Sequence, residues 1–192
     1  MPPTTPDLLD AEYFTVTAQP TFVVDDLTLR PWSPDDAPAV FEAFQDSGIQ
    51  RWHARSAVSV VEVRGWLEVW AKAWSEATHA NWAVVDTGTD ALLGRASLRD
   101  IRLPYGQAEV AYWTVPAARG RGVAPRAAAT LTDWALNARG FHRIELAHSV
   151  RNTQSCRVAR KLGFALEGTR RSAGLHADGW HDMHLHARIR GD

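Results

Sequence analysis

Residues 110 to 128, VAYWTVPAARGRGVAPRAA, join an alternating apolar run to an alanine-rich run. Between the two runs stand Arg119, Gly120, Arg121 and Gly122. A turn of small residues that opens a helix points backbone N–H groups at one spot, where the helix dipole adds partial positive charge. Glycine lets a phosphate approach the backbone closely, and arginine donates to phosphate oxygens in a fixed fork. The stretch therefore predicts a diphosphate-binding strand–loop–helix.

Three other motifs explain this loop less well. The dinucleotide-binding fingerprint G-x-G-x-x-G/A fails at its third position, which is Pro125. A Walker loop ends in Gly-Lys-Ser/Thr, and this loop lacks that ending. RGG-type RNA-binding segments are repeated, whereas this one is single and stands between regular elements. A tight structural turn with surface arginines stays an open alternative for the loop taken alone.

The formal net charge of −1 hides a basic region from residue 119 to residue 171. Eleven lysines and arginines stand there against three acids, which leaves a local charge of +8. A positive field of this kind favours an anionic ligand, and a solvated basic face is the alternative.

Length, cysteine content and hydropathy limit the class of protein. The chain has 192 residues, 45% of them hydrophobic, which suits one soluble globular domain. Its one cysteine, Cys156, excludes an internal disulfide. The chain has no long apolar run, and its first residues lack the pattern of a secretion signal. We expect a cytoplasmic monomer or homodimer with no DNA and no membrane partner.

Hydrophobic periodicity and turn residues predict the order of elements. Residues 1–20, rich in Pro and Thr, predict a flexible arm, and residues 21–192 predict one domain. Ser33 and Pro34 suit the start of a helix that runs to about residue 44. A second amphipathic helix starts at the capping-box sequence SVVE. Strands are expected at 22–32, 81–86, 91–100, 107–115, 142–150, 164–171 and 182–189, and further helices at 123–138 and 152–162. This order predicts an α/β (α+β) domain with a mixed, mostly antiparallel sheet of six to seven strands and about four helices.

Two motifs in this order resemble the GNAT acetyltransferase superfamily. Arg119, Gly122 and their neighbours resemble its acyl-CoA signature, R/Q-x-x-G-x-G/A, which follows the fourth strand in that family. The sequence NTQSCRVARKLGFALEGTRR, from Asn152, is similar to N-x-x-S-x-R-V-x-x-K-L-G-F-x-x-E-G of the Rim-type ribosomal-protein N-terminal acetyltransferases. The resemblance runs from about Phe22 to Arg190. It implies a GNAT fold whose sheet is splayed between the fourth and fifth strands.

The resemblance also implies that acetyl-CoA, as acyl donor, lies in this splayed opening. Its pantetheine would follow the fourth strand, and its pyrophosphate would lie on the N–H groups of the glycine loop. The residues assigned to the cosubstrate are Trp113, Thr114, Val115, Arg119, Gly120, Arg121, Gly122, Val123, Ala124, Asn152 and Ser155. Asn152 is alternatively only the N-cap of its helix. Pro125 stands where many relatives carry Thr or Ser and offers no N–H, so Arg121 or Arg126 would have to compensate.

Glu109 and Ser155 are the catalytic candidates. Glu109 lies among apolar residues on the strand expected to line the opening, where a carboxylate can have a raised pKa and act as a base through water. It resembles the base position of AEIGYW-type segments, and the alternative is an ion pair with an arginine at the sheet rim. Ser155 resembles the serine near the CoA sulfur, which would donate to the thiolate, and the alternative is a capping serine. Many GNAT members use a tyrosine at the position of Ala159, so that route is closed.

Cys156 and the histidine-rich C-terminal end offer further chemistry. We expect Cys156 to be a small packing residue and the transfer to be direct, in a ternary complex without a covalent enzyme intermediate. His184 and His186 would share a strand face, which is compatible with a metal. Because no cysteine or ordered acidic spacing supports a metal site, we predict none. A contact with the acceptor amine by one of the C-terminal histidines, which also include His176 and His181, is the better-supported function.

The acceptor is the least constrained part of the prediction. A peptide α-amine has a pKa of about 7.7–8.0 and a lysine about 10.4, so an α-amine loses its proton more easily. A polycationic aminoglycoside or polyamine would require clustered acids. The candidates for such a cluster are Asp46, Glu62, Glu68, Asp100 and Asp178. A small-molecule amine as acceptor and a non-catalytic CoA-binding or RNA-associated protein stay open as alternatives. The tryptophan row Trp66, Trp70 and Trp74 predicts helix-to-sheet core, or alternatively a wall of the acceptor pocket.

Overall fold

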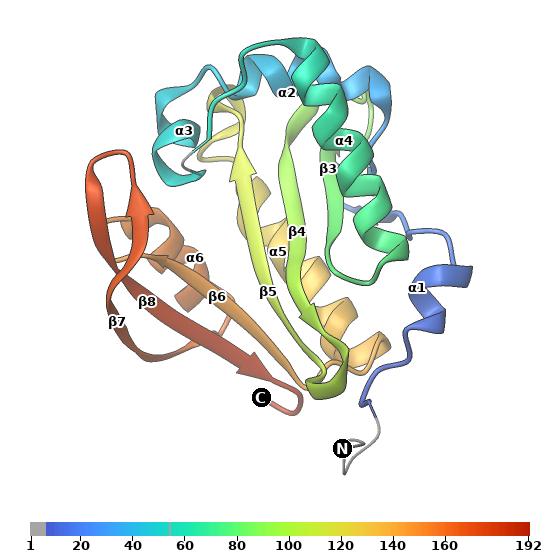
Figure 1. Cartoon of the computed structure of the whole chain (residues 1–192), viewed down its shortest axis with the longest axis vertical. Coiled ribbons are helices and arrows are strands. Elements are labelled where there is room, and N and C mark those ends of the chain that lie inside the picture. The colour runs from blue at the N-terminus through green and yellow to red at the C-terminus, as the bar shows by residue number, and fades with distance from the viewer. Residues whose placement is uncertain (1–6, 54) are drawn as a thin grey trace.

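The structure, a computed structural model that describes residues 7–53 and 55–192, is built on one eight-stranded sheet (Figure 1). The strand order is β1-β2-β3-β4-β5-β6-β8-β7, and the pair β5 and β6 is parallel while all other neighbours are antiparallel. The strands are β1 Phe22–Val24, β2 Leu27–Pro31, β3 Ala80–Asp86, β4 Leu92–Arg102, β5 Gln107–Thr114, β6 Arg143–Ser149, β7 Ala165–His176 and β8 Gly179–Ile189. The mixed, mostly antiparallel sheet of the sequence prediction is confirmed, with one strand more than expected.

The described residues form six α-helices around this sheet. They are α1 Glu12–Val16, α2 Ala37–Ala43, α3 Ser47–His53, α4 Val60–Ser75, α5 Val123–Asp133 and α6 Thr153–Lys161. Helix α4 lies over one face and α5 over the other (Figure 1). The side chain of Ser59 caps α4 by accepting from the Glu62 N–H at 3.1 Å, as the capping-box sequence predicts. Within the described residues, no helix combines the length and the apolar character needed to cross a bilayer.

The predicted single strand over 22–32 is wrong, because this segment forms the hairpin of β1 and β2. Asp25 turns the chain with a positive φ of 52°, a conformation that aspartate tolerates better than most residues. No glycine or proline marks this turn in the sequence, so the two short strands have the sequence pattern of one longer strand. The hairpin supplies the eighth strand. The short helices α1 and α3 account for the two helices beyond the expected four.

Part of the predicted N-terminal arm packs against the domain. Leu9 and Phe14 are buried in the main core. The Phe14 ring meets the Trp74 ring edge-on, with centroids 5.0 Å apart. The Leu9 N–H donates to the Leu103 carbonyl oxygen at 3.2 Å. This part of the segment is therefore fixed by packing rather than loosely attached, while residues 1–6 of the predicted arm lie outside the described residues.

Strand β5 separates two cores. Ala108 and Val110 pack in the core beneath α5, whereas Trp113 packs on the opposite face, in the core formed with α2 and α4. Residues 108 and 110 lie an odd number of positions from residue 113, so strand geometry places their side chains on the opposite face. The predicted tryptophan row is also core: Trp70 and Trp74 are buried in these two clusters.

The sheet is splayed between β5 and β6, as the family resemblance implies. The two strands pair over only three positions, from Gln107 opposite Arg143 to Glu109 opposite Glu145. Beyond Glu109 each strand follows its other neighbour, because β5 stays paired with β4 as far as Thr114 and β6 stays paired with β8 as far as Ser149. The unpaired edges therefore diverge and leave a V-shaped opening (Figure 1).

Candidate active site

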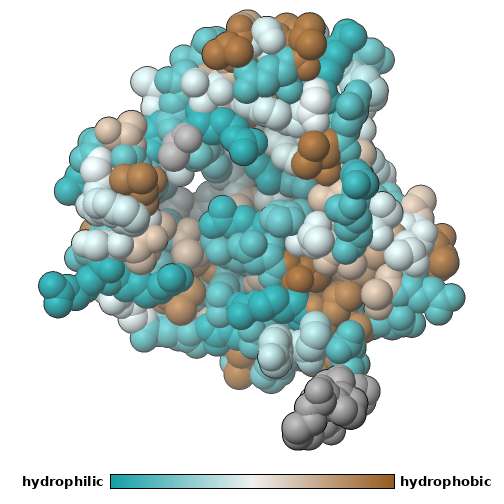
Figure 2. Space-filling model, in the orientation of Figure 1, coloured by the Kyte–Doolittle hydropathy of each residue, from teal (hydrophilic) through white to brown (hydrophobic). Residues whose placement is uncertain are grey.

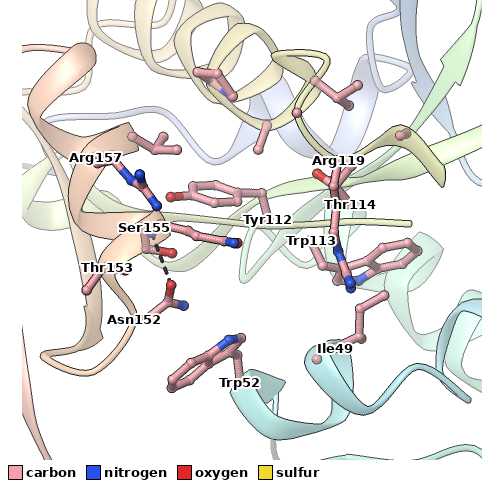
Figure 3. A pocket seen from close by; sticks show the side chains of 18 of the residues that line it. Ile49, Trp52, Tyr112, Trp113, Thr114, Arg119, Asn152, Thr153, Ser155 and Arg157 are labelled. Carbon is pink, nitrogen blue, oxygen red and sulfur yellow. Dashed lines mark hydrogen bonds between the residues drawn. The ribbon is translucent and has the colours of Figure 1, made fainter. Parts of the chain in front are cut away.

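Two adjoining pockets occupy the opening between β5 and β6. The large pocket, of about 590 Å³, is walled by α3, the end of β5, the loop before α5 and the start of α6 (Figure 3). The small pocket, of about 110 Å³, extends along β5 and β6 toward their paired ends. Figure 2 shows the surface hollowed beside the β7–β8 hairpin, where the opening lies. Five residues line both pockets: Trp52, His53, Tyr112, Asn152 and Ser155.

The loop before α5 has the geometry of an anion cradle. Gly120 and Gly122 have positive φ values of 79° and 73°, and Gly122 directly precedes the helix. An L side chain is strained in this conformation, which explains the two glycines. The N–H groups of the first helical turn have no partner inside the helix. Val123 and Ala124, two of the residues assigned to the cosubstrate, line the large pocket there, while Pro125 contributes no donor.

Most of the arginines near the cradle are neutralised by acids from distant parts of the chain. Arg119 lines the large pocket but forms an ion pair with Asp46, and Arg126 forms one with Asp26. Arg121 also faces Asp26, at 3.9 Å, and lies outside the lining of both pockets. The part of the predicted basic region that flanks the cradle is therefore paired with acids, and Arg121 and Arg126 both lie outside the pocket lining in which Pro125 stands.

Arg157 is the exception among the basic residues at this site. It projects from α6 toward the large pocket (Figure 3) and makes no ion pair with any described residue. Its guanidinium therefore remains available for an anionic group bound on the α5 cradle across the opening.

The direction of the backbone groups along the free edge of β5 limits which residues can form hydrogen bonds with pantetheine. The Val115 N–H donates to the Leu93 carbonyl oxygen on the β4 side, at 2.9 Å. Backbone polar groups alternate in direction along a strand. Trp113 and Val115 therefore turn their backbone groups to β4, whereas Thr114 and Tyr112 turn theirs to the opening. Of the three residues predicted to bind pantetheine, only Thr114 turns its backbone N–H and C=O groups to the opening. Tyr112, which was not predicted, also does so.

Asn152 and Ser155 stand together at the start of α6. The Asn152 Oδ1 accepts from the Ser155 N–H at 3.1 Å, which makes Asn152 the N-cap of the helix (Figure 3). Its expected capping role is confirmed, and its side chain also lines both pockets. The cap fixes the first turn of α6 and thereby the position of Ser155.

Tyr112 brings to the site a hydroxyl that the sequence reasoning missed. Ala159, at the position of the tyrosine in many relatives, is fully buried in the core. Tyr112 instead reaches across from β5 toward α6 (Figure 3). Its hydroxyl oxygen is buried and has no hydrogen-bond partner among the described residues. Burial raises the pKa of Tyr112 to about 12, against a smaller opposite effect of the neighbouring Ser155, so the hydroxyl keeps its proton at neutral pH.

His53 is a second residue that the sequence reasoning missed, because helix α3 itself was not predicted. Burial lowers the pKa of His53 to about 4, and the positive charges of Arg95 and Arg99 act in the same direction. The imidazole is therefore neutral at neutral pH. It lies where the two pockets meet, beside Trp52 of the same helix.

Glu109 is not brought into either pocket. It is the last residue of β5 that pairs with β6, and its Oε1 accepts from Arg99. It is absent from the lining of both pockets, while Arg99 lines the small one. This geometry matches the alternative expectation, an arginine-paired carboxylate at the sheet rim. No aspartate or glutamate lines either pocket within the part of the chain that the structure describes.

The family profile of the GNAT acetyltransferase domain matches residues 26–165. Over 153 residues the chain is 24% identical to an uncharacterized N-acetyltransferase, YoaA, of Bacillus subtilis, with 79% of this chain and 86% of YoaA covered. Over 100 residues it is 32% identical to the ribosomal-protein-serine acetyltransferase of Escherichia coli, and this match covers 52% of the chain and 56% of that protein.

Solved structures show the same fold. The ribosomal-protein-S5-alanine acetyltransferase of Vibrio fischeri superposes with a TM-score of 0.80 at 25% identity, over 90% of this chain and 97% of that one. The profile match covers most of the domain and includes both β5 and the α5 cradle. The chain belongs to the GNAT acetyltransferase family and is an acyl-CoA-dependent N-acetyltransferase.

Proposed function

We propose that the protein transfers an acetyl group from acetyl-CoA directly to the α-amine of a peptide or protein N-terminus. The observation that carries this proposal is the small pocket beside Ser155 and Tyr112, which has Arg99 and a neutral His53 in its wall and no carboxylate from any described residue. The acceptor must therefore reach Ser155 without the help of a negative charge in the pocket wall.

A polycationic acceptor fits this pocket poorly. The five acids that could attract a polyamine or aminoglycoside, Asp46, Glu62, Glu68, Asp100 and Asp178, all lie outside the lining of both pockets. Asp46 is paired with Arg119. Asp178 lies 3.2 Å from Arg151 and 3.6 Å from Arg51. These acids do not converge on the site, so a polycation would enter a positively charged pocket without compensation.

The electrostatics of the small pocket favour a neutral amine. Burial and nearby arginines lower the pKa of His53, and they would also lower the pKa of an acceptor ammonium group bound beside it. An α-amine, with a pKa of about 7.7–8.0, needs a much smaller shift than a lysine at about 10.4. The site therefore selects the amine that loses its proton readily, and it does so without a carboxylate in contact.

Each group of the large pocket has a place in the transfer. The N–H groups from Gly122 to Ala124 would hold the pyrophosphate, together with Arg157, and the free edge of β5 at Thr114 would hold pantetheine. The amine nitrogen attacks the thioester carbonyl carbon, the C–S bond breaks, and the leaving thiolate takes a proton from a hydroxyl group. The nitrogen loses a proton as the amide forms, and this proton restores the hydroxyl, so the products are the amide and the free thiol of CoA. Ser155 and the protonated Tyr112 are the hydroxyl donors available for the thiolate.

The relatives support a small first residue on the acceptor. Two of them are named for serine and for alanine of ribosomal proteins. A pocket of about 110 Å³ suits side chains of that size. We therefore expect peptides that begin with Ser or Ala to be better acceptors than peptides that begin with a large residue.

The test measures thiol release from acetyl-CoA and the mass of the product. A peptide that begins with Ser or Ala is compared with the same peptide blocked at its N-terminus but carrying an internal lysine, and with a polyamine–aminoglycoside mixture. Acetylation of the free N-terminus alone is expected. Turnover with the blocked peptide or with the polycations, and none with the free N-terminus, would overturn the proposal.

A further inference from the structure

Four side chains from three elements gather on the sheet face that α6 covers. His148 comes from β6, His184 and His186 come from β8, and Cys156 comes from α6. One ligand atom of each lies within 4.8 Å of the corresponding atom of every other member. The register explains the arrangement, because His148 lies directly opposite His184, and His186 lies opposite Leu146 on the same face.

The hydrogen bonds of this cluster account for only part of its nitrogen atoms. The His148 Nδ1 donates to the Ser149 carbonyl oxygen at 2.8 Å, so its Nε2 carries the lone pair. That Nε2 lies within hydrogen-bond distance of the His186 Nε2, at 3.2 Å, so the two nitrogens face one another. The His184 Nδ1 is buried and has no hydrogen-bond partner among the residues that the structure describes. Unpartnered buried nitrogens are rare in a protein interior, and each is costly unless something else binds there.

We propose that His148, Cys156, His184 and His186 form a tetrahedral Zn²⁺ site. Imidazole nitrogens and a thiolate are the ligands that Zn²⁺ selects in proteins, with four protein ligands in structural sites. Zn–N bonds of about 2.0–2.1 Å place two nitrogens of a tetrahedron about 3.3 Å apart, close to the spacing of His148 and His186. The bond from the His148 Nδ1 to a carbonyl oxygen is the type of outer contact that orients a metal-bound histidine.

The donor set of the cluster, three imidazoles and one thiol, fits a borderline-soft cation. No aspartate or glutamate belongs to the cluster, which sets it apart from sites for Mg²⁺ or Ca²⁺. Four protein ligands leave no open position on the metal, so the ion would have a structural role.

What the bound metal would do follows from the position of Cys156, which is the neighbour of Ser155 on α6. A metal bound by Cys156 and by three sheet histidines would tie the first turn of α6 to β6 and β8. It would hold Ser155 where the two pockets meet. The Asn152 cap by itself fixes Ser155 relative to the rest of α6 but not relative to the sheet. This inference concerns the chain's own ligands and does not depend on which amine is acetylated.

The test uses the full-length protein, first stripped with a chelator and then titrated with Zn²⁺ and, separately, with Co²⁺. Wild type is expected to bind one Zn²⁺ per chain. With Co²⁺ it is expected to show a thiolate-to-cobalt charge-transfer band and the intense visible bands of a tetrahedral ion. The conservative variant Cys156→Ser is expected to lose the charge-transfer band and to bind Zn²⁺ at least about tenfold more weakly. The matched control is His142→Gln, an exposed histidine outside the cluster, which keeps both properties.

Two results would overturn the proposal. One is wild-type protein that retains no stoichiometric Zn²⁺ after dialysis. The other is a charge-transfer band that persists in Cys156→Ser. Because serine replaces the thiol with little change of volume, circular dichroism is expected to show a folded variant, and the metal titration then reports on the ligand itself. A rise in the melting temperature with Zn²⁺ in wild type, and a smaller rise in Cys156→Ser, provides a second readout that does not involve activity.

Discussion

The hydroxyl group of Tyr112 on β5 is buried beside Ser155 on α6, at the point where the two pockets of the opening meet. The two residues come from opposite sides of the splay in the sheet (Figure 3). The pair combines one serine at a helix start with one tyrosine whose proton is retained at neutral pH. In the proposed transfer, this pair supplies the two hydroxyl donors for the leaving thiolate.

Tyr112→Phe and Ser155→Ala should both lower kcat. Loss of a positioned proton donor costs about 10²–10⁴-fold when no substitute exists. Since each hydroxyl can partly replace the other, we expect about a tenfold loss for each single variant and a more than additive loss for the double variant. KM for acetyl-CoA should change little. A Tyr112→Phe enzyme with wild-type kcat, alone and in the Ser155→Ala background, would exclude the tyrosine from the chemistry.

Arg157→Gln should weaken acetyl-CoA binding. Arg157 lines the large pocket without an ion pair to a described residue, and a charge-assisted hydrogen bond to phosphate contributes about 1.5–3 kcal/mol. KM for acetyl-CoA should rise about 10- to 100-fold, with a small change in kcat. The control is Arg121→Gln, which removes an arginine that faces Asp26 outside the pocket and should leave KM within a few fold. Equal effects of the two changes would refute a specific contact.

Gly122→Ala should destabilise the protein and impair cosubstrate binding. Gly122 has a φ of 73°, and a left-handed conformation costs about 1–2 kcal/mol for a residue with a Cβ atom. Gly65→Ala is the matched control: Gly65 lies inside α4, and an added Cβ would meet no atom within 4 Å. That change should stabilise the protein by up to about 1 kcal/mol. Urea unfolding measures both, and a neutral Gly122→Ala would show that the loop relaxes.

His53 should make the folded protein sensitive to acid. Its pKa is about 4 in the folded state and about 6.5 in the unfolded chain, so the unfolded chain binds a proton first as the pH falls. Stability should therefore be complete above about pH 6.5 and fall by up to about 3 kcal/mol toward pH 4. Unfolding of wild type and His53→Asn, compared across this range, isolates the contribution of His53. Parallel curves would mean that the imidazole is not held neutral by the fold.

Glu109→Gln tests the base role predicted from the sequence. Glu109 is paired with Arg99 and lies outside both pockets, so we expect kcat/KM to fall less than tenfold at neutral pH. A general base that acts directly would cost about 10²–10⁴-fold, with loss of the acid limb of the pH–rate profile. A decrease of that size would restore Glu109 as the base, acting through water.

Local sequence patterns predicted much of the scaffold. The period of two along a strand is a local property, and it places Ala108 and Trp113 on opposite faces of β5. The capping residues of α4 and α6 are also readable, because a cap is a contact between residues three apart. The hairpin at Asp25 was missed because its turn carries neither glycine nor proline.

The sequence by itself determined the strand–loop–helix with its two glycines, since positive φ values restrict residue type locally. Only the tertiary structure decided how the charges and side chains around that loop combine. Arg119 is neutralised by Asp46, 73 positions away in the chain. Tyr112 meets Ser155, and Cys156 meets His148 and His186, because the splay of β5 from β6 and the return of β8 set which elements face one another. Local patterns fix dihedral angles and the face on which a residue lies, whereas contacts between distant elements depend on the packing of the whole sheet.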